Sequence, residues 1–295
     1  MTITISAAAV KELREHTGAG MMECKAALQA AQGDLAKAIE ELRKSGSAKA
    51  GKKAGRIAAE GAIVQLRDGQ RAVMVEINSE TDFVARDAHF TAFAKAVAET
   101  ALQANQQDLH TLSTLSLQGS PELTVEEARQ QLVAKVGENV QIRRVVVSQA
   151  SAAGVGTYLH GHRIGVIVEL DVNNSDLARD IAMHIAASKP MVILPTDMSP
   201  EETAKEKEIY TAQAATSGKP PEIIEKMVMG RLKKFLDEVS LVGQPFVKDP
   251  DMTVGSLLTK HRAKVLAFYR FEVGEGIEKV SEDFKEAVMS QVQGS

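Results

Sequence analysis

The sequence has 295 residues, which is long for one hydrophobic core, so we expect two or more domains. A net charge of −4 excludes a strongly basic nucleic-acid-binding protein, and 4% aromatic residues without tryptophan argue against base-stacking surfaces. One cysteine, Cys24, excludes an internal disulfide framework. The chain starts without a secretory signal pattern and has no run of about 18 apolar residues, so we expect a cytoplasmic protein without membrane spans.

Residues 1–44 predict three short helices. Ser6 is a suitable N-cap for a first helix that ends at Gly18, and a second helix covers about 21–31. Asp34 is the expected N-cap of a third helix that reaches Lys44. The next residues, KSGSAKAGKKAGR, are rich in Gly, Ala and Lys and have no apolar face. The pattern therefore predicts a small helical bundle followed by a basic linker at 45–56.

The middle of the chain contains an internal repeat. Residues 72–87, AVMVEINSETDFVARD, align without a gap with residues 165–180, GVIVELDVNNSDLARD. Each copy has the pattern of a β-hairpin followed by a helix, and a later strand closes each unit, at 140–148 and at 265–273. The fold class is therefore predicted as α+β, with a repeated two-part core. The core subdomains are expected at 57–150 and at 151–198 with 240–274.

An insertion interrupts the second copy. Ser199, Pro200 and Glu202 have the spacing of a capped helix start, and a second helix begins near Pro221 with an apolar stripe. Residues 199–239 therefore predict an antiparallel helical hairpin that projects from the core. Residues 275–295 predict a glycine-rich connection and a short C-terminal helix with Phe284 and Val288 on one side.

One motif resembles a phosphate-binding loop. Residues 46–53, GSAKAGKK, nearly match G-x-x-x-x-G-K-[ST], but Lys53 stands where the Mg²⁺-binding hydroxyl belongs. No strand is predicted before the motif, so we interpret it as part of the basic linker. A nonspecific phosphate contact by Lys52 or Lys53 stays open.

Catalytic motifs are absent from the sequence, which has no G-x-S-x-G, H-E-x-x-H or paired C-x-x-C. His160 and His162 flank a predicted hairpin turn without a third metal ligand nearby, and His184 is interpreted as a partly buried core residue. We therefore expect no enzymatic activity, no metal and no cofactor.

The strand-to-helix turn of the first copy carries Phe83 beside Asp82, although such turns are usually polar. Phe83 could fold back onto the core as a hydrophobic staple. The second copy has Ser175 and Asp176 at the matching positions, so the repeated frame does not require phenylalanine there. We favour an exposed phenylalanine that inserts into a pocket of a partner.

Several longer stretches together resemble one protein family. They are HTGAGMMECKAAL, TDFVARD, GENVQIRRV, HIAASKP, SGKPPEIIEKMVMGRLKKF, SLVGQPFV and RFEVGEGIEKV. In this order and spacing they closely resemble the bacterial elongation factor Ts family, from one end of the chain to the other.

The resemblance implies a guanine-nucleotide exchange factor of elongation factor Tu, the GTPase that delivers aminoacyl-tRNA to the ribosome. It implies a UBA-like bundle of three helices, a two-part core, a coiled-coil hairpin and a C-terminal module. The family's T-D-F-V segment lies near the Mg²⁺ and nucleotide site of the GTPase, which assigns that role to Thr81, Asp82, Phe83 and Val84. Further implied contacts with the GTPase are Arg14, Val136, Gly137 and His160.

On this view Phe83 is a wedge that moves a loop or helix of the GTPase, and Asp82 is a charge that disfavours Mg²⁺ or its water ligands. Two other classes stay open. An RNA-binding module could use the cations of the basic linker, but the net charge and the few aromatics argue against direct RNA binding. An enzyme with Asp82 and His160 as acid and base would lack an orienting third group. We therefore expect elongation factor Tu as the partner, and neither DNA nor a membrane.

Overall fold

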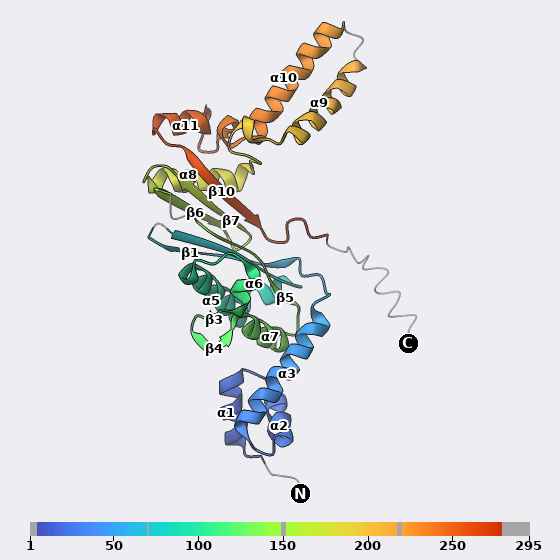
Figure 1. The fold of residues 1–295 in the computed structure, drawn as a ribbon, viewed down its shortest axis with the longest axis vertical. Coiled ribbons are helices and arrows are strands. Elements are labelled where there is room, and N and C mark those ends of the chain that lie inside the picture. Colours follow the sequence, from blue (N-terminus) through green and yellow to red (C-terminus); the bar gives the residue numbers. More distant parts are fainter. Residues whose placement is uncertain (1–4, 70, 149–151, 217–219, 279–295) are drawn as a thin grey trace.

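The computed structural model is an elongated α+β molecule, which confirms the predicted fold class (Figure 1). It describes residues 5–69, 71–148, 152–216 and 220–278. An N-terminal helical bundle, a pair of stacked sheets with their helices, and a helical hairpin follow one another along the long axis. Within these described ranges, no helix is long and apolar enough to cross a membrane.

The N-terminal bundle consists of α1 (Ala7–Thr17), α2 (Met21–Ala30) and the first part of α3 (Leu35–Lys53). Ser6 caps α1 and Asp34 caps α3, each through a backbone N–H of the first turn, as predicted. Fully buried side chains from the first two helices form the centre of the bundle, namely Leu13, Cys24 and Leu28.

The prediction that the third helix stops at Lys44 is wrong, and so is a linker over most of 45–56. α3 continues through Lys53 and packs along α7 (Val125–Val136), where Gly46 and Ala50 are buried. Residues 45–53 are mostly small or basic, so the sequence shows no apolar helix face there. Packing against α7 stabilises this part of the helix instead. α3 therefore connects the bundle to the core as one continuous helix, whose second part packs on α7.

The first half of the core is an antiparallel sheet of β1 (Glu60–Asp68), β2 (Arg71–Ser79) and β5 (Val140–Val147), with β2 in the centre. α5 (Ala88–Ala104) and α7 cover its outer face, and α4 (Asp82–Ala85) is a single turn between β2 and α5. The remaining elements are α6 (Leu109–Thr114), β3 (Ser116–Leu117) and β4 (Ser120–Thr124). Three side chains of β2 point into this core, namely Val73, Val75 and Ile77.

The second half repeats this plan, as the sequence repeat predicts. Its sheet contains β6 (Gly154–His160), β7 (Ile164–Leu170) and β10 (Val265–Glu272), with β7 in the centre and α8 (Ser175–Ser188) on the outer face. The end of this half is completed by β8 (Pro245–Phe246), β9 (Asp249–Thr253) and α11 (Val254–Lys260).

The two sheets stack face to face, so that the core has the layer order helix, sheet, sheet, helix (Figure 1). Met74 of β2 and Ile167 of β7 are fully buried between the sheets. Gly165 allows the close approach, because a Cβ there would lie only 2.6 Å from the Sδ of Met74. A strand that is buried on both faces has a nearly continuous apolar sequence, and the central strands β2 and β7 both show this pattern.

The predicted helical hairpin is present and projects from the end of the second half (Figure 1). It consists of α9 (Pro200–Ala215) and α10 (Pro221–Val239), and the 3-10 helices η1 (Pro195–Asp197) and η2 (Leu241–Gly243) lie at its base. The Ser199 hydroxyl accepts the N–H of Glu202 at 3.1 Å, as the capping pattern predicts. Ser217-Gly-Lys-Pro-Pro predicts the turn between the two helices, but residues 217–219 of it and the predicted C-terminal helix with Phe284 and Val288 lie outside the described residues.

His184 ties α8 to the base of the hairpin, and it is fully buried instead of partly buried. Its Nδ1 accepts the N–H of Val247 at 3.2 Å, so Nε2 carries the hydrogen and donates to Gln244 Oε1 at 3.0 Å. Burial lowers the pKa of His184 and outweighs the opposing hydrogen bond with Gln244. The side chain is therefore a neutral structural group.

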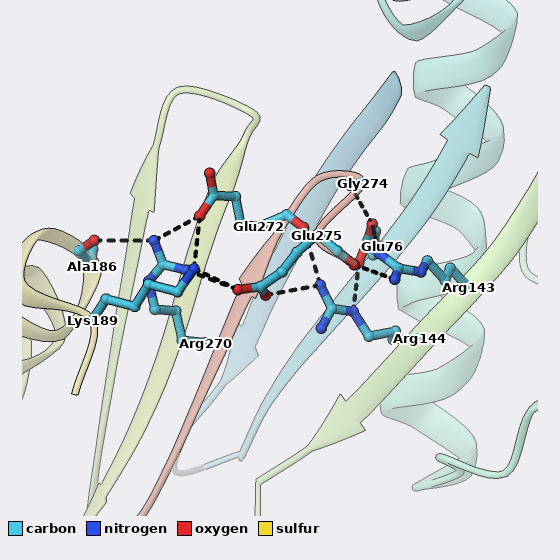
Figure 2. A network of polar contacts seen from close by, with 9 residues as sticks. All are labelled: Glu76, Arg143, Arg144, Ala186, Lys189, Arg270, Glu272, Gly274 and Glu275. Atoms are coloured by element: carbon cyan, nitrogen blue, oxygen red, sulfur yellow. Dashed lines mark hydrogen bonds and ion pairs between the residues drawn. The ribbon is translucent and has the colours of Figure 1, made fainter. Parts of the chain in front are cut away.

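A carboxylate buried between the halves joins them (Figure 2). Glu76 of β2 has no exposed surface, and it accepts hydrogen bonds from Arg143 at 3.0 Å and Arg144 at 2.6 Å, both on β5. It also accepts the N–H of Gly274 at 2.9 Å. Because Gly274 follows β10, this bond links the first sheet to the last strand of the second.

The network continues into the second half through Glu275 (Figure 2). The Glu275 carboxylate lies 2.8 Å from the Lys189 Nζ and 3.8 Å from the Arg144 Nη2. Arg270 of β10 donates to Glu272 at 3.0 Å and lies 3.8 Å from Glu275. Burial opposes ionisation of Glu275, but the hydrogen bond from Lys189 and the charges of Arg270 and Arg144 outweigh it, so the pKa of Glu275 is lowered.

We predict that Glu76→Ala lowers the free energy of unfolding by about 3 kcal/mol, because it leaves two arginines facing each other without their shared acceptor. Urea unfolding of both proteins measures this loss. The matched control is Glu40→Ala, which removes an exposed carboxylate paired with Lys44 and should cost less than about 1 kcal/mol. Equal, small losses for the two variants would show that the Glu76 network does not hold the halves together.

Candidate functional site

The segment predicted to bind the partner is the single turn α4 at the junction of β2 and α5. The Thr81 hydroxyl caps the turn by accepting the N–H of Val84 at 3.4 Å. The turn ends at Ala85 because Asp87 caps α5 and starts a new helix. In the second copy, Asn174 caps α8 at the position that matches Thr81, and that helix continues without a break. The same junction therefore presents an isolated turn only in the first half.

Phe83 is 82% exposed, so the structure confirms the favoured prediction of an exposed side chain and contradicts the staple. Its neighbours take the inward positions of the turn: Ala85 is buried and Val84 packs against the first core. The inward residues hold the turn and leave the phenyl ring outside. An apolar ring in this position can enter a pocket of another protein without disturbing the core.

Asp82 lies beside this ring at the start of the turn. Its carboxylate accepts a hydrogen bond from Arg86 at 2.9 Å, and the two side chains are 43% and 68% exposed. An exposed pair of this spacing contributes only about 0.3–0.5 kcal/mol. The carboxylate can therefore leave Arg86 for another partner at little cost.

The loop between α7 and β5 holds this segment in place. Glu138 accepts both the N–H of Thr81, at 2.9 Å, and its hydroxyl, at 2.7 Å. In the opposite direction, Glu80 accepts the N–H of Asn139 at 2.6 Å. Sequence reasoning missed Glu80, Glu138 and Asn139. The signal that could have identified them is a pair of acidic residues, one directly after a predicted strand and one directly before the strand that pairs with it.

Val136 ends α7 and Gly137 follows it, directly before Glu138, so the structure places both next to the residue that holds Thr81. Gly137 caps α7 with a φ of 79°, a conformation that favours glycine. Its carbonyl accepts a hydrogen bond from Lys53 at the end of α3. The buried Asn139 side chain donates to the carbonyl of Arg56 at 2.7 Å. The end of α3 is therefore part of the frame of the site.

His160 ends β6 and is exposed, with its Nδ1 3.3 Å from the Tyr158 hydroxyl. The hairpin turn that follows contacts β1: the N–H of Ile63 donates to the carbonyl of His162 at 2.8 Å. Arg163 also donates to Glu60 at 2.6 Å, and Glu60 pairs with the last residue of β2. The structure thus brings this turn to the end of the first sheet from which α4 leaves.

Arg14 lies on the bundle, in another part of the molecule. It is exposed on α1 and lines a shallow surface groove with the exposed side chains of Met21 and Met22. Asp82 and His160 bond to different side chains, Asp82 to Arg86 and His160 to Tyr158, so the structure does not pair them as an acid and a base. In the described parts of the chain, no group of three or more His, Cys, Asp or Glu side chains is arranged to hold a metal ion.

Comparison with known proteins places the chain in one family. A family described as "Elongation factor TS" matches residues 80–275, which include α4 and most of both halves. A relative named "Elongation factor Ts" from Thioalkalivibrio sulfidiphilus is 57% identical over 296 residues, covering 99% of this chain and 100% of the relative. Proteins of the same name from Legionella pneumophila and Francisella tularensis subsp. novicida are 57% and 56% identical, each covering 98% of this chain and 99% of the relative. The chain belongs to the elongation factor Ts family.

Proposed function

We propose that this chain is a guanine-nucleotide exchange factor that binds elongation factor Tu and promotes GDP release, so that GTP can bind during translation elongation. The observation that carries the proposal is Phe83, which is 82% exposed on a capped turn in a member of the elongation factor Ts family. A rigid, exposed aromatic ring is suited to a pocket of a partner. Thr81, Asp82, Phe83 and Val84 then form the central contact, with Val136 and Gly137 beside them.

Exchange of this kind follows from thermodynamic linkage. A factor that weakens GDP binding to the GTPase must itself be weakened by GDP to the same extent. The GTPase holds Mg²⁺ through the phosphates and a few protein oxygens, so a small shift of its loops weakens both metal and nucleotide. In the proposed complex Phe83 shifts the protein frame and Asp82 acts on Mg²⁺ or its water ligands. No covalent bond is made or broken, and the factor needs no catalytic group.

The alternative function, RNA binding through the basic residues near the end of α3, has less support. Lys49 is bonded to Glu23 and Lys53 to the carbonyl of Gly137. These two cations act within the chain, where they fasten the bundle and the loop of the site. Nucleic-acid binding needs cations that are free to replace counterions along a phosphate backbone.

We predict that Phe83→Ala slows the catalysed release of labelled GDP from elongation factor Tu roughly tenfold or more, because burying a phenyl side chain is worth about 1.5–3 kcal/mol. Folding stability should change by less than about 0.5 kcal/mol, since the ring is exposed. The matched control is Asp176→Ala, the exposed position of the second copy that aligns with Phe83. Equal losses in the two variants would overturn the wedge assignment.

A second prediction separates the charge from the wedge. Asp82→Asn keeps the shape of the side chain and removes its charge. The interaction energy of two unit charges 4 Å apart is about 1–4 kcal/mol near a protein surface. Pairing with Arg86 reduces that effect, so we expect a loss of at most roughly tenfold in Mg²⁺. Chelating Mg²⁺ with EDTA should remove most of the Asp82→Asn defect and only part of the Phe83→Ala defect. An Asp82→Asn defect of unchanged size in EDTA would exclude a role in displacing the metal.

A third prediction concerns the bundle. Removing residues 1–44 should weaken binding to elongation factor Tu, because it removes Arg14 and the groove beside it. The rest of the chain should stay folded, because the part of α3 from residue 45 onward keeps its packing on α7. Calorimetric titration measures the affinity, and circular dichroism of the shortened chain controls for folding. Unchanged affinity would contradict a docking role of the bundle.

A further inference from the structure

We infer that Glu138 is a positioning residue for nucleotide exchange, which holds the Asp82–Phe83 turn at the angle that the GTPase requires. It acts through Thr81 and has no contact of its own with nucleotide or metal in this scheme. Because it acts on exchange, this role rests on the proposed function.

The Glu138 carboxylate holds Thr81 at two atoms. Both Glu138 oxygens bind Thr81, one at 2.9 Å from its N–H and the other at 2.7 Å from its hydroxyl oxygen. The same hydroxyl accepts the N–H of Val84. Because Thr81 bonds both to Glu138 and to Val84, the position of the Glu138 carboxylate determines where the single turn α4 begins. Charge-assisted hydrogen bonds in a two-pronged arrangement define orientation as well as distance.

A second bond joins the same two loops in the opposite direction. Glu80 precedes Thr81 and accepts the N–H of Asn139, which follows Glu138, at 2.6 Å. One loop follows β2 and the other precedes β5, and they meet because Ser79 at the end of β2 pairs with Val140 at the start of β5. Two carboxylates thus cross-link the loops in opposite directions at the end of the sheet. This arrangement fixes the turn in translation and in rotation.

The outward side chains of the turn have few contacts, whereas Ala85 and Val84 on its inner side pack on the first core. A helix of four residues has no stability of its own. Phe83 is 82% exposed, and the Asp82 carboxylate accepts a hydrogen bond from Arg86, the residue that directly follows the turn. In the second copy, Asn174 caps the 14-residue α8, which packs along its sheet. The second copy also has a carboxylate between the corresponding loops, since Asp171 accepts the N–H of Lys264 at 2.6 Å. The two-pronged bond of Glu138 to Thr81 lies at the copy that presents the exposed ring.

The experiment compares Glu138→Gln, Phe83→Ala and the double variant in GDP release from elongation factor Tu, at saturating concentrations of the factor. Glutamine keeps the size but cannot accept two hydrogen bonds from Thr81 with one carbonyl oxygen in the same geometry. We expect Glu138→Gln to lower the maximal release rate about fivefold, equivalent to about 1 kcal/mol or one hydrogen bond. The affinity for the GTPase should change much less, because the contact surface is retained.

The double variant separates positioning from direct contact. If Glu138 acts through the turn, the loss in the double variant should be clearly smaller than the product of the two single losses, because Phe83 is already removed and only the placement of Asp82 remains to be disturbed. Fully additive losses would overturn the inference, because they would mean that Glu138 acts independently of Phe83. Thr81→Val removes the hydroxyl and should reproduce the Glu138→Gln defect. If Glu138→Gln lowers the melting temperature, Thr81→Val is the second test. A wild-type release rate for Thr81→Val would then reject the inference.

The matched control is Glu127→Gln, at the start of the same helix α7, where the side chain caps the helix and lies 3.9 Å from Arg43. Its release rate should equal that of the wild type. A wild-type chain that fails to accelerate GDP release would reject the proposed function itself. An active wild type with an equally active Glu138→Gln variant would reject only the role of Glu138.

Discussion

The stacking of two sheets around a buried carboxylate is the constraint on which the rest of the structure depends. Glu76 is removed from water at a cost that only its full set of partners offsets: two arginines of the neighbouring strand and the N–H of Gly274 from the other half (Figure 2). These partners come together only when both halves are folded and in register. The network therefore selects one relative placement of the two sheets, which apolar packing alone specifies less sharply.

That placement has consequences at the edge of the core. The end of β2 carries the loop that leads into α4, and the adjacent β5 begins with the loop that holds it. The hairpin turn after His160 reaches the same end through the bond between Ile63 and His162. Residues more than 80 positions apart in the chain thus frame one exposed aromatic ring. The first core therefore holds the inward side chains of this small turn, Val84 and Ala85, and leaves Phe83 exposed.

The two halves share one fold but differ at the junction between the central strand and the helix that follows it. Both keep the N-cap at the strand-to-helix junction, as Thr81 and as Asn174. In the first half, Asp87 caps a new helix and cuts off a single turn, whereas the matching Asp180 lies inside α8 and pairs with Lys248. Phe83 lies on this separate turn, and the matching Asp176 is exposed on the continuous helix as well. The second half uses its continuous helix to support the base of the helical hairpin through His184.

Local sequence determined much of this protein: the helix caps, the repeat, the paired strands, the helical hairpin and the exposure of Phe83, which the comparison of the two copies indicated. These features depend on short spacings and on residues whose backbone preferences are strong. Only the tertiary structure decided that α3 continues to Lys53, because its stability there comes from α7. The cross-link by Glu80 and Glu138 was likewise decided by the fold, since it joins loops that meet only after β2 and β5 have paired.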